Sequence, residues 1–158
     1  IELGGSLAWV RRWVLKGLQP DQLDLLNRIV DAAEQIPIND IPVSLSMIEV
    51  DRYHEEAAYV VHRWAEIFEL PVGIVMLVQP PNVNLILRAR VQGLHLGRIA
   101  QLFGGGGHAT AASARVADRM PVELREELLR ALAVPGLAAC QVGAGPIDEG
   151  ARPAPAQV

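Results

Sequence analysis

An apolar run at residues 72–79 constrains the fold more than any other part of the sequence. It reads Val-Gly-Ile-Val-Met-Leu-Val-Gln, without the polar alternation of a strand that has one face in water. Such a run predicts a strand that is buried on both faces at the centre of a sheet. Pro80, Pro81 and Asn82 then supply a turn, and residues 83–91 form a second strand-like run. We expect these two strands to pair as an antiparallel hairpin.

Helix-like and strand-like segments alternate around this hairpin. Apolar residues at helical spacing predict helices at about residues 6–16, 20–35, 53–69, 96–103 and 121–132, and further strand-like segments fall at residues 43–50 and 115–117. Pro37 and Pro42 bracket a predicted loop. Together these segments predict an α/β fold with a mixed, largely antiparallel central sheet of about four to five strands, flanked by helices and preceded by two connector helices.

The composition indicates a folded body that does not cross a membrane. Apolar residues make up 51% of the 158 residues and the mean hydropathy is +0.23, which excludes disorder for most of the chain. No apolar run approaches the roughly 20 residues that span a bilayer. The single cysteine, Cys140, excludes a disulfide framework and a multi-cysteine zinc site, so the cytoplasm is the expected location. Gly, Ala and Pro dominate residues 136–158, which predicts a flexible linker or tail.

The acidic residues are unevenly distributed along the chain. Residues 70–117 contain four arginines and no Asp or Glu, while the other 10 of the 14 basic residues accompany all 18 acidic residues elsewhere. The net charge of −4 excludes a broadly basic nucleic-acid surface, but the acid-free window predicts a local anion site. An apolar core is the other explanation, because acidic residues are rare in cores. The composition leaves both explanations open.

The most distinctive motif in this window is Gly104-Gly105-Gly106-Gly107-His108. Consecutive glycines lose much conformational entropy on folding, so they indicate a backbone that a ligand approaches closely. In a loop that enters a helix, free N–H groups would face an incoming anion. His108 can donate a hydrogen bond to a phosphate oxygen or to a base. The motif matches neither the Gly-Lys-Ser/Thr phosphate-binding loop nor a dinucleotide fingerprint, and a flexible connector is the alternative explanation.

Arg88 and Arg90 form a second candidate anion site. The two-residue period of a strand places both guanidinium groups on one face, where two planar forks suit a phosphate. A charged edge strand that deters aggregation is the alternative. Because no Asp or Glu is near in the sequence to neutralise the pair, we favour an anion site.

The glycine motif and the Ala111-Ala112-Ser113-Ala114 that follows resemble the C-terminal, DHH-associated substrate-binding domain of the DHH phosphoesterase superfamily. That domain carries Gly-Gly-Gly-His followed by Ala-Ala-Gly, and Ser113 replaces the last glycine here. The Ala-Ala-Ser-Ala version is more similar to the branch fused to CBS domains and a tRNA nucleotidyltransferase or poly(A) polymerase module. The Leu-Arg-Ala-Arg strand resembles the Leu-Arg-Ser strand of the superfamily, and the resemblance covers residues 38–132.

The resemblance implies a lobe that holds substrate for a catalytic domain outside this chain. Gly104–Gly107 and His108 would hold a substrate phosphate or terminal nucleotide, and Arg88 or Arg90 the phosphate chain. The metal-binding Asp-His-His motif of the superfamily does not occur in this sequence. The Mn or Mg ions would therefore belong to a missing N-terminal catalytic domain, and we assign no catalytic or metal-binding residue here.

The resemblance also implies a division of the chain. Residues 1–37 would be a helical connector from the catalytic domain, residues 38–135 the α/β binding domain, and residues 136–158 a linker, with CBS or nucleotidyltransferase domains expected downstream. The start at Ile1 rather than Met fits a piece of a longer protein.

The expected function is to bind RNA 3′ or 5′ ends, or oligonucleotide phosphates, for a phosphoesterase that is part of a tRNA nucleotidyltransferase-like protein. The chain alone would then be inactive as an enzyme. One alternative is a regulatory domain without catalysis that binds an adenine nucleotide or polyphosphate. Another is the lobe of an oligoribonuclease-like or exopolyphosphatase-like phosphoesterase.

Overall fold

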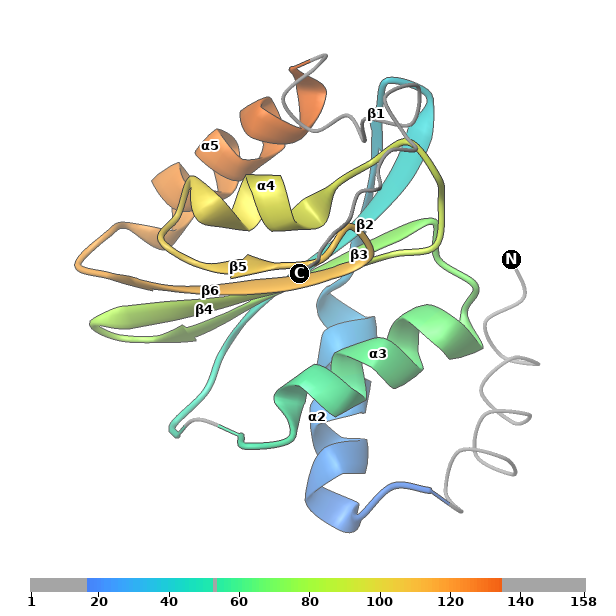
Figure 1. Ribbon diagram of the computed structural model, residues 1–158. Helices are drawn as coiled ribbons and strands as arrows, with labels where there is room; N and C mark the ends of the chain where they lie inside the picture. Colours follow the sequence, from blue (N-terminus) through green and yellow to red (C-terminus); the bar gives the residue numbers. More distant parts are fainter. Residues whose placement is uncertain (1–16, 53, 135–158) are drawn as a thin grey trace, which may run out of the picture.

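The computed structural model describes residues 17–52 and 54–134, which form one mixed sheet with helices (Figure 1). The strands are β1 (Glu34–Ile38), β2 (Ile41–Glu49), β3 (Val72–Gln79), β4 (Asn82–Ala89), β5 (Gly106–Gly107) and β6 (Ala111–Ala117). The helices are α2 (Pro20–Ala32), α3 (Ala57–Ile67), α4 (Leu96–Gln101) and α5 (Pro121–Ala133). The sheet order is β1-β2-β3-β4-β6-β5. Only β2 and β3 are parallel, so the predicted α/β fold with a largely antiparallel sheet is confirmed.

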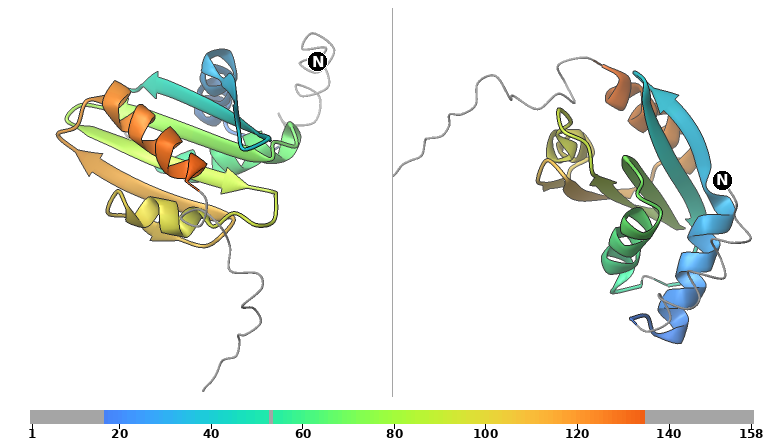
Figure 2. Two further views of the ribbon diagram at one scale, coloured as in Figure 1. Left: turned by 90° about the horizontal axis from the view of Figure 1, so that it is seen from above. Right: turned by 90° about the vertical axis from the view of Figure 1, so that its right-hand side faces the viewer.

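Helices cover both faces of the sheet. On one face lie α4 and α5, whose Leu96 and Leu128 join the same apolar cluster as the inner residues of β3, β4 and β6. Figure 2, left, shows these two helices lying over the sheet from above. On the other face lie α2 and α3, whose Ile29 and Trp64 form a second cluster with β3 and β4. The sheet is therefore the middle of three layers.

β3 is the buried central strand that the apolar run predicts. Its residues from Val72 to Val78 are all buried. Alternate side chains contribute to the two clusters, Ile74 to one and Val75 to the other. The predicted hairpin is confirmed as well, because β3 pairs with β4 in antiparallel register.

The sheet has six strands rather than the predicted four to five, and the first extra strand is β1. The predicted helix 20–35 stops at Ala32, because Ala33 is already extended with a ψ of 136°. The segment expected to be a loop is a β1–β2 hairpin in which Pro37 faces Pro42. Asn39 and Asp40 form its two-residue turn with φ values of 50° and 67°, the left-handed geometry of a tight hairpin.

The second extra strand, β5, comes from the glycine loop itself. It pairs with β6, which begins at Ala111, although the sequence predicted a strand only from residue 115. β4 ends at Ala89 rather than at residue 91. α3 begins at Ala57 rather than at residue 53. The predicted helix at residues 6–16 and the predicted tail at 136–158 lie outside the described residues.

β1 crosses the predicted domain boundary between residues 37 and 38. α2 also packs against the body of the fold through Leu25, Leu26 and Ile29. The division into connector, binding domain and tail stays a prediction. In the described ranges, none of the helices has the length and apolar character needed to cross a bilayer.

Candidate functional site

The fold itself explains three of the four consecutive glycines. Gly104 has a φ of 82°, which an L side chain rarely adopts. A Cβ on Gly105 would lie 2.0 Å from the carbonyl oxygen of Ser113, and one on Gly107 would lie 2.4 Å from that of Ala111. The loop therefore needs glycine to pack its backbone against β6. Gly106 differs, because its φ is not positive and a Cβ there would have no neighbour within 4 Å.

The backbone amides of the loop are largely used within the fold. The loop leaves the C-terminal end of α4, so the helix N-terminus that would favour an anion is not located there. Gly105 N–H donates to the Ala100 carbonyl at 2.9 Å and Gly104 N–H to Gln101 at 3.2 Å, so these amides cap α4. The prediction of free N–H groups at a helix entrance is therefore wrong for Gly104 and Gly105.

The fold places His108 and Arg88 in one row across the sheet. His108 N–H donates to the Ala111 carbonyl at 2.7 Å, which continues the β5–β6 register by one residue. Ala111 in turn lies directly opposite Arg88 of β4. Two strand spacings separate the two Cα atoms by about 10 Å, with only a methyl group between them. Side chains directly opposite each other share one face of a sheet, so Arg88 and Ala111 share the face covered by α3, and His108 follows one residue after the end of β5.

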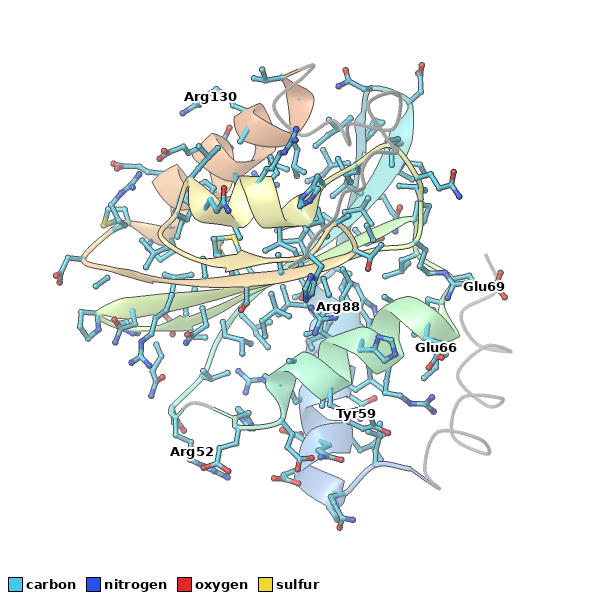
Figure 3. All side chains as sticks on the ribbon, in the orientation of Figure 1. Arg52, Tyr59, Glu66, Glu69, Arg88 and Arg130 are labelled. Carbon is cyan, nitrogen blue, oxygen red and sulfur yellow. The ribbon has the colours of Figure 1, made fainter. Side chains whose placement is uncertain are left out.

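Arg88 is a fixed positive charge without a carboxylate partner in the described structure. Its Nη1 donates to the Leu87 carbonyl at 2.9 Å and its Nη2 to the Ala58 carbonyl of α3 at 3.3 Å. Figure 3 shows Arg88 between the sheet and α3. Partial burial lowers the pKa of its guanidinium by desolvation, but an arginine remains charged in proteins. Neutral carbonyls therefore hold the group in place and leave its charge available.

Arg90 reaches the same hollow from just beyond the end of β4. Its N–H donates to the Pro71 carbonyl at 2.8 Å, and it is exposed. The hollow is about 180 Å³ and includes Arg88, Thr110 and Glu66 in its lining. The absence of acidic residues near these arginines in the sequence does not hold in space, because α3 brings Glu66 beside them. Glu66 is itself bonded to Arg63 at 2.9 Å.

The sequence reasoning did not find Glu66, His62 and Thr110, which also line this hollow. His62 and Glu66 are one turn apart on α3, so their shared direction was readable from helical spacing, but their proximity to β4 depends on how α3 crosses the sheet. Across residues 17–52 and 54–134, no three His, Cys, Asp or Glu side chains lie close enough together to hold a metal ion.

Comparison with known proteins identifies related sequences and folds. The sequence model of the DHHA1 domain matches residues 43–133, close to the range 38–132 of the predicted resemblance. The A-adding tRNA nucleotidyltransferase of Geobacter sulfurreducens is 29% identical over 132 residues. That alignment covers 84% of this chain but 15% of the relative, so the chain spans a small part of the relative's length.

Solved structures share the fold at lower identity. An exopolyphosphatase-related protein from Bacteroides fragilis has a TM-score of 0.57 and 18% identity, over 77% of this chain and 37% of that chain. The C-Ala domain of Aquifex aeolicus alanyl-tRNA synthetase has a TM-score of 0.54 and 14% identity, over 64% of this chain and 99% of that chain. At these identities the likeness concerns the fold alone.

Proposed function

The chain belongs to the DHHA1 domain family, and from that premise we propose that it is a substrate-binding lobe that holds a terminal phosphate of an oligonucleotide for a DHH-type phosphoesterase. The observation that carries the proposal is the row in which Arg88 and His108 flank Ala111. A guanidinium and an imidazole on either side of a small residue leave room for a phosphate between two donors.

Each residue of the proposed site has a distinct role. Arg88 supplies a charge that α3 holds in place, so little side-chain entropy is lost when a phosphate binds. Arg90 is exposed and supplies a second, more mobile contact to a neighbouring phosphate. Gly104, Gly105 and Gly107 let the backbone lie flat on β6, which fixes where His108 leaves the sheet.

We extend the proposal to the longer protein. A parent chain related to tRNA nucleotidyltransferases would present RNA ends to this lobe, and the Mn or Mg chemistry would belong to a catalytic domain outside the chain. On this proposal the 158-residue chain binds but does not hydrolyse. A cytoplasmic location fits its single cysteine, Cys140.

A titration of the 158-residue chain with a diadenylate tests the proposal. The 5′-phosphorylated form should bind more tightly than the form without a terminal phosphate. Arg88→Ala and His108→Ala should each weaken binding of the phosphorylated form by about tenfold, since each removes a charged or polar hydrogen bond. Arg130→Ala, on α5 at the other face of the sheet, is the matched control and should leave binding unchanged (Figure 3).

Unchanged binding by both site variants would overturn the site assignment. A chain that binds inorganic polyphosphate and neither form of the dinucleotide would overturn the choice of substrate. The melting temperature of each variant shows whether a loss of binding reflects a loss of folding.

A further inference from the structure

A second hollow lies on the same face of the sheet as Arg88. It has a volume of about 360 Å³ and is lined by residues of β4, β5, β6 and the loop before β5. Its polar lining comes from Asn84, Ser113 and Arg115, and no carboxylate lines it. Asn84 lies directly opposite Arg115, and Ser113 lies opposite Gly106. The acid-free stretch of the sequence thus forms an acid-free hollow here, and not around Arg88 and Arg90.

Asn84 carries a buried side-chain amide whose nitrogen is unpaired among residues 17–52 and 54–134. It is 7% exposed, and its Nδ2 has no partner within the described structure. The other two buried polar side chains of the described ranges are both bonded: Ser44 accepts from Gln35 at 2.7 Å, and Ser46 donates to Ile29 at 2.8 Å. A buried amide group left unpaired destabilises the fold, so an apolar residue of similar size would be the stable choice for this position.

Gly106 is a glycine that the fold does not require. A Cβ there would meet no atom within 4 Å, and its φ is not positive. A glycine inside a strand lowers stability, and it often marks a place where a ligand approaches the backbone closely. Gly106 lines the hollow beside Asn84, so two independent features of the chain indicate a ligand at one place.

Arg115 completes the lining with an uncompensated charge. It is exposed on β6, and within residues 17–52 and 54–134 its side chain forms no ion pair or hydrogen bond. A guanidinium can stack on the face of a base as well as bind an anion. Ser113, on the same strand, adds a hydroxyl that can donate or accept.

We propose that this hollow binds the nucleobase of the nucleotide whose phosphate the Arg88–His108 row holds, and that the Asn84 amide reads the edge of an adenine. The inference rests on the proposed function for the phosphate but not for the base. Asn84 and Arg88 are four residues apart along β4, about 13 Å, which is of the order of the length of a nucleotide. An asparagine amide offers a donor and an acceptor side by side, which adenine matches and guanine, with two adjacent acceptors at that edge, does not.

The test uses the 158-residue chain and four small probes: AMP, GMP, adenosine and ribose 5-phosphate. AMP should bind about tenfold more tightly than GMP or ribose 5-phosphate, the usual discrimination of a two-point base contact. Asn84→Leu should reduce AMP affinity to that of ribose 5-phosphate, leave ribose 5-phosphate binding unchanged, and raise the melting temperature. A purely structural Asn84 would instead lower the melting temperature when it is replaced.

Gly106→Ala is a second variant that does not depend on the tolerance of position 84. Its methyl group enters the hollow without meeting a protein atom, so the melting temperature should be unchanged or slightly raised while AMP and adenosine binding weaken. Arg130→Gln, remote from the hollow, should change neither quantity.

Three outcomes separate this inference from the proposed function. Equal binding of AMP and ribose 5-phosphate would overturn the base site and leave the phosphate site standing. Binding of AMP by Asn84→Leu and Gly106→Ala as in the unmodified chain would also overturn it. Adenosine binding that is lost in Asn84→Leu but retained in Arg88→Ala would support the base site even if no phosphate probe bound.

Discussion

Gly97 of α4 lies directly against the carbonyl group of Gly107. A Cβ on Gly97 would come within 2.6 Å of that oxygen, and the Gly97 N–H donates to the His108 carbonyl at 2.9 Å. The first turn of α4 therefore contacts the backbone on both sides of His108. These two contacts fix the backbone of His108 against α4. The end of the glycine loop therefore positions the His108 backbone.

Gly97→Ala should destabilise the fold and weaken phosphate binding together. The added methyl group has no space beside a backbone carbonyl, so we expect a loss of about 1–3 kcal/mol in the free energy of unfolding. Relief of the contact moves His108, which should lower affinity for a 5′-phosphorylated dinucleotide. Urea unfolding and a titration measure the two effects.

Gly17→Ala is the matched control for Gly97→Ala. The nearest atom to its added Cβ is Tyr59 Oη at 3.8 Å, an ordinary contact, so both quantities should stay within error. Unfolding of Gly97→Ala at the urea concentration of the unmodified chain would contradict a steric clash at this position.

Adjacent glycines of the loop should respond in opposite ways to alanine. Gly105→Ala places a methyl group 2.0 Å from the Ser113 carbonyl oxygen, and only a shift of β5 away from β6 could relieve this clash. We expect the free energy of unfolding to fall by about 3 kcal/mol or more, the upper end of the losses caused by overpacking. Gly106→Ala meets no atom and should be neutral or stabilise by about 0.5 kcal/mol through the unfolded chain. Chemical denaturation of the two variants side by side checks this, and equal destabilisation would contradict the distinction.

The β1–β2 turn offers a prediction about the strand that the sequence reasoning missed. Asp40 has a φ of 67°, so Asp40→Gly should raise the free energy of unfolding by about 0.5–1 kcal/mol as it removes the cost of a left-handed residue. Asp40→Ala should lower it, because alanine lacks the local hydrogen bonds that help aspartate there. Thermal unfolding measures both, and a stabilising alanine would contradict the turn geometry.

The parts of the fold that were predictable are those in which one pattern dominates. The run at residues 72–79 predicted β3 because a short apolar run bounded by prolines is typical of a strand buried on both faces, and the turn after it predicted β4. β1 was missed because all five of its residues are exposed or half-buried and one of them is a proline, so neither alternation nor an apolar run marks it. Asn39-Asp40 is a dipeptide that suits a two-residue hairpin turn, but Pro37 and Pro42 on either side of it indicated a loop instead.

The sequence nominates the residues of the proposed site but not their surroundings. The motif and the resemblance point to Arg88 and His108 as candidates, and the register of three strands aligns their backbones in one row. The two-residue period of a strand also places Asn84 on the same face as Arg88, and an asparagine within an apolar strand could have been recognised as a candidate from the sequence. Glu66 could not be predicted beside Arg90, because residues distant in sequence meet only through the crossing of α3 over the sheet.

Glu66 provides a prediction on the phosphate site itself. Its carboxylate lines the hollow of Arg88 and Arg90 and is bonded to Arg63 in an exposed ion pair, so its removal should cost little stability. The negative charge of Glu66 repels a phosphate that enters the hollow, but water weakens the repulsion. Glu66→Gln should therefore tighten binding of a 5′-phosphorylated dinucleotide by about two- to threefold at low salt. Because salt screens exposed charges, the gain should shrink in 1 M salt.

Glu69→Gln is the matched control, since Glu69 is an exposed carboxylate close in sequence that does not line the hollow (Figure 3). It carries the same change in net charge, so a gain equal to that of Glu66→Gln would mean that the whole-chain field and not the hollow is responsible. Weaker binding by Glu66→Gln would contradict the prediction in a more informative way. That result would mean that the carboxylate accepts a hydrogen bond from the ligand. A ribose hydroxyl can donate such a bond and a phosphate dianion cannot, so the hollow would hold the sugar rather than the phosphate.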